Sequence, residues 1–115
     1  MTTRQSADQA MLAYLRATER HMDHFGSALP GNQDRAPHRL AIVAVDEYDF
    51  GWVYFYNSQE YIETGDFLSA LGGNAPVIVS RESCELFETG TAFPTEYYIQ
   101  QFIVGLRTPV SREYL

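Results

Sequence analysis

The sequence predicts a small α+β domain in which an N-terminal and a C-terminal helix pack against an antiparallel sheet of about four strands. Three observations predict it: a helical repeat of apolar residues near the N-terminus, two pairs of strand-forming segments joined by short turns, and an aromatic helical repeat near the C-terminus. A chain of 115 residues has the size of one domain, so residues 1–115 are assigned to a single unit. The order helix, hairpin, short helix, hairpin, helix predicts that the helices cover one side of the sheet.

A first helix is predicted to begin at Ser6, which has the capping-box spacing to Gln9. It should run for about five turns and end at Gly26. The apolar repeat that defines it consists of Ala7, Ala10, Met11, Tyr14, Leu15, Met22 and Phe25. The segment GSALPGNQDRAP that follows has no periodicity and is typical of a loop.

Two hairpins are predicted downstream. HRLAIVAVDEYD and GWVYFYNS form the first, around a turn at residues 46–51, and PVIVS and CELFETG form the second, around residues 81–83. Alternation places Trp52, Tyr54 and Tyr56 on one face of the second strand and Val53 and Phe55 on the other. Because both faces are apolar, this strand is expected to lie inside the sheet.

The segment between the hairpins, YIETGDFLSALGG, has Phe67, Leu68 and Leu71 at the spacing of a short helix. The paired glycines that follow suit the end of such a helix, the next asparagine can bond its own backbone in a turn, and Pro76 opens the following strand. We therefore interpret the stretch GGNAPVIVS as a structural turn and strand start rather than as a catalytic or binding motif.

A closing helix is predicted to carry Pro94 in its first turn. Its buried stripe should consist of Tyr98, Ile99, Phe102, Ile103 and Leu106. The last residues, RTPVSREYL, are expected to be loose or weakly docked.

Negative charge is concentrated in the middle of the chain. Residues 46–96 hold ten carboxylates and one base, Arg81, which gives this segment a net charge of −9. Nucleic acid and anionic membrane are disfavoured as partners because both bind through basic side chains. A protein partner with a basic surface is favoured, since opposite fields steer two surfaces together. The alternative is that the acidic surface only keeps the protein soluble.

Partner-binding residues are expected among acids and aromatics at turns, where side chains are exposed. Aromatic side chains beside carboxylates can form the centre of a protein interface. The candidates are Asp46, Glu47, Tyr48, Asp49, Glu60, Tyr61 and Glu63.

Catalytic and metal chemistry finds little support in the residues. The chain contains no lysine, which excludes lysine Schiff bases and a P-loop. His21 and His24 have a spacing that could hold a metal, but no third ligand is identifiable, so we interpret them as a solvated helix end. Cys84 is interpreted as a packing residue, and no catalytic residue, metal or cofactor is predicted.

A cytoplasmic location is expected. Cys84 is the only cysteine, so no intrachain disulfide can form, which fits a reducing compartment. No apolar stretch follows the N-terminal arginine, and the longest aliphatic run, LAIVAV, is too short to cross a bilayer.

Three segments resemble the YrhB-like family, also called the immunity protein 35 family of bacterial polymorphic-toxin systems. They are GWVYFYNSQEYIETGD, LGGNAPVIVSRESCELFETGT and FPTEYYIQQF, which together cover roughly residues 40–103. The motif positions are Gly51, Trp52, Gly73, Asn74, Pro76, Gly90, Pro94 and Tyr98. One departure is the turn RESCE, where the family pattern leads us to expect a glycine near Cys84.

The resemblance implies a small intracellular protein that binds and neutralises a toxin domain, and that is not an enzyme. The motif residues carry over as scaffold positions, with Trp52 in the core. A chaperone-like accessory protein and a small enzyme with a pocket of acids and tyrosines are the alternatives. Whether the protein forms a homodimer stays open.

Overall fold

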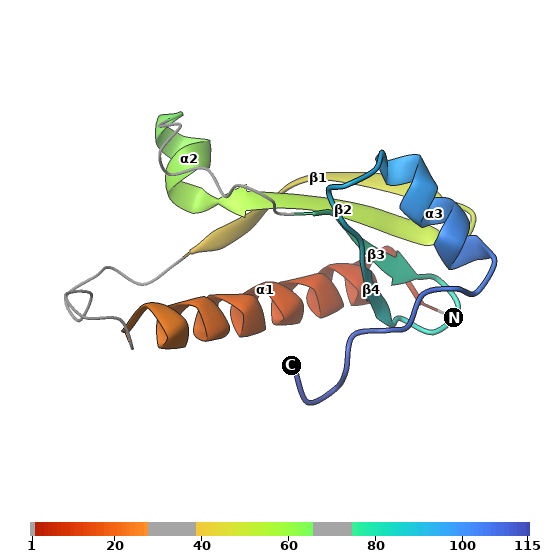
Figure 1. Ribbon diagram of the computed structural model, residues 1–115, viewed down its shortest axis with the longest axis horizontal. Coiled ribbons are helices and arrows are strands. Elements are labelled where there is room, and N and C mark those ends of the chain that lie inside the picture. Colours follow the sequence, from red (N-terminus) through yellow and green to blue (C-terminus); the bar gives the residue numbers. More distant parts are fainter. Residues whose placement is uncertain (1, 28–38, 66–74) are drawn as a thin grey trace.

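The computed structural model describes residues 2–27, 39–65 and 75–115, with the side chains of residues 23–27 excepted. Four strands form one antiparallel sheet in the order β1-β2-β3-β4: β1 (Leu40–Tyr48), β2 (Gly51–Ser58), β3 (Val77–Ser80) and β4 (Leu86–Glu88). Three helices accompany it: α1 (Arg4–Ser27), α2 (Gln59–Thr64) and α3 (Thr95–Ile103) (Figure 1). The predicted α+β class, both hairpins and the interior position of β2 are confirmed.

The sheet separates two apolar layers, and α1 and α3 lie on opposite faces of it (Figure 1). On one face, Met11 and Leu15 of α1 pack against Trp52 and Tyr54 of β2. On the other face, Ile99 of α3 packs in a smaller cluster with buried side chains of the inner strands, among them Val53, Ile78 and Phe87. The expectation that both helices cover one side is therefore wrong. β2 and β3 are apolar on both faces, so each face needs its own cover.

The residue that caps the first helix lies three positions earlier than predicted. Thr3 precedes the helix, and its Oγ1 accepts a hydrogen bond from the backbone N–H of Ser6 at 3.1 Å. Ser6 is thus inside the first turn. The helix runs for 24 residues, which is about seven turns instead of the predicted five. Near its C-terminal half, Glu19 is buried, pairs with Arg16 at 3.2 Å and accepts the backbone N–H of Leu40 at 2.7 Å. These contacts fix the start of β1 to α1.

The short helix α2 was not predicted at its observed position. The hydroxyl of Ser58 accepts from the backbone N–H of Tyr61, and Gly65 ends the helix in a left-handed conformation with φ +70°. A serine before the helix and a glycine after it are ordinary capping signals, so the segment QEYIET could have been recognised. The helix expected around Phe67, Leu68 and Leu71 lies outside the described residues.

The closing helix α3 is shorter on its C-terminal side than the predicted stripe. Pro94 occupies the N-cap position instead of the first turn, and the helix ends at Ile103. Tyr98 and Ile99 are buried, whereas Ile103 is 53% exposed and Leu106 lies beyond the helix with 71% of its surface exposed. The C-terminal part of the predicted buried stripe is therefore wrong.

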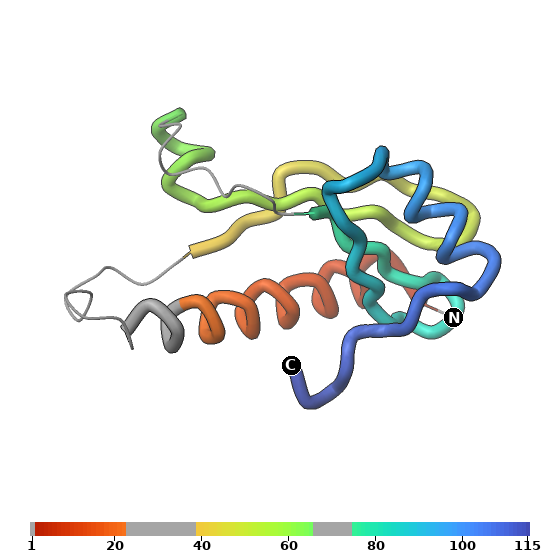
Figure 2. Tube along the Cα trace, in the orientation of Figure 1, coloured from red at the N-terminus to blue at the C-terminus, as the bar shows by residue number. Residues whose placement is uncertain are grey.

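The C-terminal tail is docked, which corrects the expectation of a loose end (Figure 2). The backbone N–H of Val110 donates to the carbonyl of Leu86 at 2.7 Å, so the tail bonds to the outer edge of β4. Further along, the ring of Tyr114 lies 5.5 Å from that of Tyr14 and stacks on His21 at 4.5 Å. The tail thus covers an edge of the sheet and part of α1.

Replacing Tyr114 by alanine should lower the free energy of unfolding by about 2 kcal/mol, because the ring contacts and the 2.6 Å hydrogen bond between its hydroxyl and Thr18 are lost. Urea unfolding followed by circular dichroism measures the change. Tyr97→Ala is the matched control, since Tyr97 is 43% exposed, and should cost less than about 1 kcal/mol. Equal costs would mean that the tail is not docked in solution.

Candidate functional site

The turn between β1 and β2 carries four of the predicted partner-binding residues. Asp46, Glu47, Tyr48 and Asp49 are all exposed at the end of β1 and in the turn. The other three, Glu60, Tyr61 and Glu63, belong to α2, which follows the opposite end of β2 (Figure 1). The structure therefore divides the predicted set into two separate groups.

Arg81 holds the β1–β2 turn in place. One of its terminal nitrogens lies 2.7 Å from a carboxylate oxygen of Glu47 and donates to the carbonyl of Tyr48 at 2.9 Å, while its Nε donates to the carbonyl of Asp49. The guanidinium carbon also lies 4.4 Å from the centre of the Trp52 ring, which belongs to the α1 face of the sheet. The charge of Glu47 is thus compensated within the protein.

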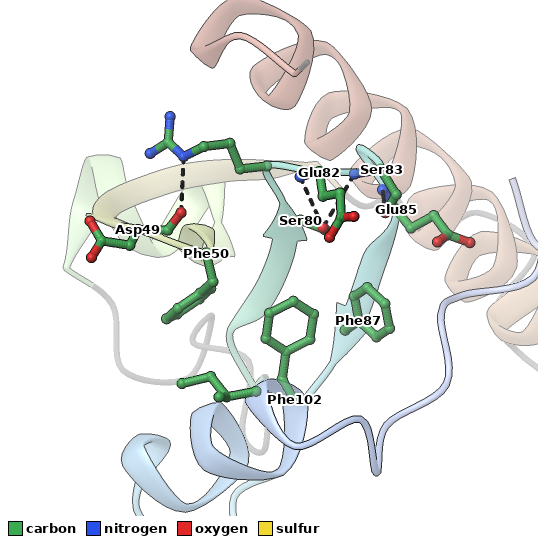
Figure 3. Close-up of a pocket in the computed structure, with 10 residues that line it drawn as sticks. Asp49, Phe50, Ser80, Glu82, Ser83, Glu85, Phe87 and Phe102 are labelled. Carbon is green, nitrogen blue, oxygen red and sulfur yellow. Dashed lines mark hydrogen bonds between the residues drawn. The ribbon is translucent and has the colours of Figure 1, made fainter.

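An open groove lies on the α3 side of this end of the sheet (Figure 3). Its volume is about 890 Å³, within the range of ligand-binding clefts. Figure 3 shows the rings of Phe50, Phe87 and Phe102 turned toward one common space, with Ile103 completing the lining. These side chains form an apolar floor to which the β1–β2 turn, β4 and α3 contribute.

Carboxylates stand around this floor. Asp49, Glu82 and Glu85 line the groove and are exposed. No ion pair joins any of them to a basic side chain within the part of the chain that the structure describes. Arg81, the one basic residue among the described lining residues, is bound to Glu47 and the neighbouring carbonyls. The groove therefore combines an apolar floor with a negatively charged rim.

The β3–β4 turn shapes one wall of the groove. The Ser80 hydroxyl accepts hydrogen bonds from the backbone N–H groups of Glu82 and Ser83. Cys84 then adopts a left-handed conformation with φ +62°, the backbone region in which glycine is favoured. The family resemblance leads us to expect a glycine near this point, and the left-handed conformation of Cys84 is one that a glycine would adopt more readily. Cys84 packs partly buried beside the α1 layer, which supports its interpretation as a packing residue.

Several motif positions that the structure describes make packing or backbone contacts. Trp52 is 1% exposed, and its indole Nε1 is buried without a hydrogen-bond partner among the described residues. A Cβ on Gly90 would lie 2.6 Å from the Tyr98 hydroxyl, so this glycine lets the Tyr98 ring approach the chain. The carbonyl of Pro76 accepts from the Thr89 hydroxyl, which joins the start of β3 to the end of β4. Gly73 and Asn74 lie outside the described residues.

The buried titratable groups serve packing. The hydroxyl of Tyr14 donates to Glu88 at 2.6 Å and that of Tyr54 donates to Asp8 at 2.6 Å. Burial, together with these hydrogen bonds, raises the pKa of both tyrosines well above the usual value of 10. Burial likewise raises the pKa of Tyr56. These groups stay neutral and join α1 to the sheet.

Of the two histidines His21 and His24, His21 has a structural explanation. The ring of His21 stacks on Tyr114, and its Nε2 lies 3.2 Å from the Tyr114 carbonyl oxygen. The side chain of His24 lies outside the described residues. Over residues 2–22, 39–65 and 75–115, no three His, Cys, Asp or Glu side chains converge as a metal site would need. No helix in the same part of the chain is long and apolar enough to cross a bilayer.

Comparison with known proteins identifies the family. The family model described as immunity protein 35 matches residues 11–101, which extends the resemblance from the motif region into α1. The uncharacterized protein YrhB of Escherichia coli (strain K12) is 36% identical over 75 residues, which cover 65% of this chain and 80% of YrhB. No solved structure matches the chain significantly. With most of its helices and strands inside the matched region, the chain belongs to the immunity protein 35 family.

Proposed function

We propose that this protein is an immunity protein that binds a cognate bacterial toxin domain in the cytoplasm and neutralises it by direct occlusion. Membership of the immunity protein 35 family supports the general role. The single observation that carries the mode of binding is the groove, where carboxylates without an ion pair to any described residue stand beside exposed aromatic and aliphatic side chains. The protein contributes a shaped surface and no chemical step.

The charge of this end suits a toxin with a basic surface around its active site. Asp46 at the end of β1, Asp49 in the β1–β2 turn, and Glu82 and Glu85 in the β3–β4 turn are exposed. The two turns neighbour each other through the contacts of Arg81. Such a one-signed surface speeds encounter with an oppositely charged partner, and the effect weakens as salt screens it. An interface of about 800 Å² per partner would cover the active-site cleft of a small toxin domain.

A chaperone-like role is the second candidate, and one observation favours it. Three apolar side chains at and just after the C-terminal end of α3 are strongly exposed. The exposed fractions are 53% for Ile103, 64% for Val104 and 71% for Leu106. A surface of this kind can hold unfolded chains. The two functions differ in that a chaperone binds many clients weakly, whereas an immunity protein binds one toxin tightly.

The test of toxin neutralisation uses the toxin domain encoded beside the gene of this protein. Co-expression should restore growth of cells that the toxin alone arrests, and the purified pair should form a stable complex of one to one. A protein that neither protects the cells nor binds the domain would contradict the proposed function. Comparable binding to several unrelated unfolded proteins would favour the chaperone-like role instead.

Charge reversal locates the binding face. Asp49→Lys with Glu82→Lys should slow association with the toxin roughly 10-fold to 100-fold at low salt, because the attractive field at the groove is lost. Glu60→Lys with Glu63→Lys is the matched control, since it changes the net charge equally at α2, the other predicted group. Stopped-flow association rates over a salt series measure both. A larger effect from the α2 pair would place the interface at that end.

A further inference from the structure

We propose that the groove between α3 and the two hairpin turns binds a partner segment in which an arginine or lysine stands beside a bulky apolar residue. This inference rests on the proposed function and adds the chemistry of the contact. It commits the groove to a protein segment rather than to a free ion, a nucleic acid or a second copy of this chain.

The floor of the groove favours an apolar side chain. Phe102 meets Phe50 at 5.3 Å and 57° and Phe87 at 4.8 Å and 65°, so the three rings are tilted against one another. Phe50 and Phe102 are only partly buried, and Ile103 is 53% exposed. Covering this surface removes apolar area from water and therefore stabilises a complex. The volume of about 890 Å³ has room for more than one side chain.

The rim favours a cation next to that apolar side chain. Asp49, Glu82 and Glu85 lack a basic partner among the described residues, while the guanidinium of Arg81 is held at Glu47 and over Trp52. A lysine or arginine can lay its aliphatic stem along the aromatic floor and present its charged end to the rim carboxylates. An acidic segment would be repelled by the same carboxylates.

Other occupants fit these residues less well. Nucleic acid would bring its phosphates against the acidic rim. A divalent cation needs converging oxygen ligands, but Figure 3 shows Asp49 and Glu85 on different sides of the groove. A free cation would also leave the rings of the floor in contact with water.

The experiment titrates the isotopically labelled protein with three short peptides and follows its backbone amide resonances. The probes are acetyl-Leu-Arg-Phe-Leu-amide, the same peptide with glutamate in place of arginine, and acetyl-Gly-Arg-Ser-Gly-amide. The first should shift the amides of Phe50, Glu82, Phe87, Phe102 and Ile103, and its affinity should exceed that of each other peptide at least fivefold. Equal binding of the glutamate peptide, or shifts confined to another region, would overturn the proposal.

A substitution at an exposed position links these shifts to the groove. Ile103→Glu should reduce the affinity for the arginine peptide at least fivefold while the protein stays folded, since this side chain is 53% exposed at the end of α3. Ile62→Glu is the matched control, because Ile62 is 45% exposed on α2, away from the groove, and should leave the affinity unchanged. Equal losses from the two variants would contradict the assignment.

A dilution series without peptide tests for a second copy in the groove. If the same amides shifted with protein concentration and sedimentation showed a dimer, a second copy would be the occupant and the proposal would be wrong. If no peptide bound but the protein still formed a complex with its toxin and protected cells, the groove inference alone would fail. If the wild-type protein failed to protect cells that express the toxin, the proposed function itself would be contradicted.

Discussion

Gly51→Ala is expected to destabilise the fold by roughly 3 kcal/mol or more, the largest effect of an added methyl group among the glycines that the structure describes. Gly51 begins β2 with φ +146°, a conformation that other residues avoid. A Cβ at this position would lie 2.0 Å from the carbonyl oxygen of Val79 and 2.8 Å from the backbone nitrogen of Arg81. Both obstacles are backbone atoms of the neighbouring strand and turn, so neither can rotate away. Urea unfolding followed by circular dichroism measures the loss.

Gly65→Ala is the matched control for this prediction. Gly65 also has a positive φ, at +70°, but the added methyl group would meet no atom of a described, non-adjacent residue within 4 Å. It should therefore cost only the backbone strain, about 1 kcal/mol. If the two substitutions destabilised the protein equally, the close approach between β2 and β3 at Gly51 would be wrong.

Alkaline solution should unfold the protein at pH values where most of its other groups do not change charge. The pKa values of Tyr14, Tyr54 and Tyr56 are raised by burial above the value of 10 that a tyrosine has in an unfolded chain. Below pH 10 both states keep these protons and stability is unaffected. Above pH 10 the unfolded chain loses protons that the folded chain retains, so stability falls as the pH rises. At pH 11 the three tyrosines together should cost up to about 4 kcal/mol.

The composition of the chain makes this pH dependence easier to assign to tyrosine. There is no lysine, so no lysine amine titrates in the same range. Urea midpoints between pH 8 and pH 11 give the slope, and tyrosinate absorbance gives the ionisation itself. Tyr54→Phe should reduce the slope by about one third, because one of the three protons is removed from the balance. Ionisation of Tyr14, Tyr54 and Tyr56 at pH 11 in a chain that stays folded would contradict the prediction.

The hairpins, the first helix and the apolar alternation of β2 were predictable because they depend on local patterns. Trp52, Tyr54 and Val53 alternate with the period of a strand, and only this arrangement buries them. The faces on which the helices lie were not predictable from element order. That choice depends on how many apolar side chains each face of the finished sheet presents, which requires the register of all four strands. The docked tail escaped prediction for a similar reason, since Val110 and Tyr114 find their partners only in β4 and α1.

The candidate site was predictable in part. The exposure of the acids at the β1–β2 turn follows from turn geometry, and the structure bears it out for Asp46, Glu47 and Asp49. The contribution of Glu82 and Glu85 was missed because nothing local shows that the second turn reaches the first. Arg81 provides that link, and a lone arginine among ten carboxylates was the available signal. Such a residue is expected to find a carboxylate, although its position alone does not say which one.

The thin apolar layer beneath α3 has a consequence for affinity. Among the described residues, Val53, Ile78, Phe87 and Ile99 are buried in it, fewer than in the layer beneath α1. Lifting α3 away from the sheet would dismantle the groove while the larger layer stayed intact. A distant substitution that loosens this helix would thus raise the apparent dissociation constant for the partner. The increase follows from the smaller fraction of molecules in which α3 is packed on the sheet, while every contact in the complex stays the same.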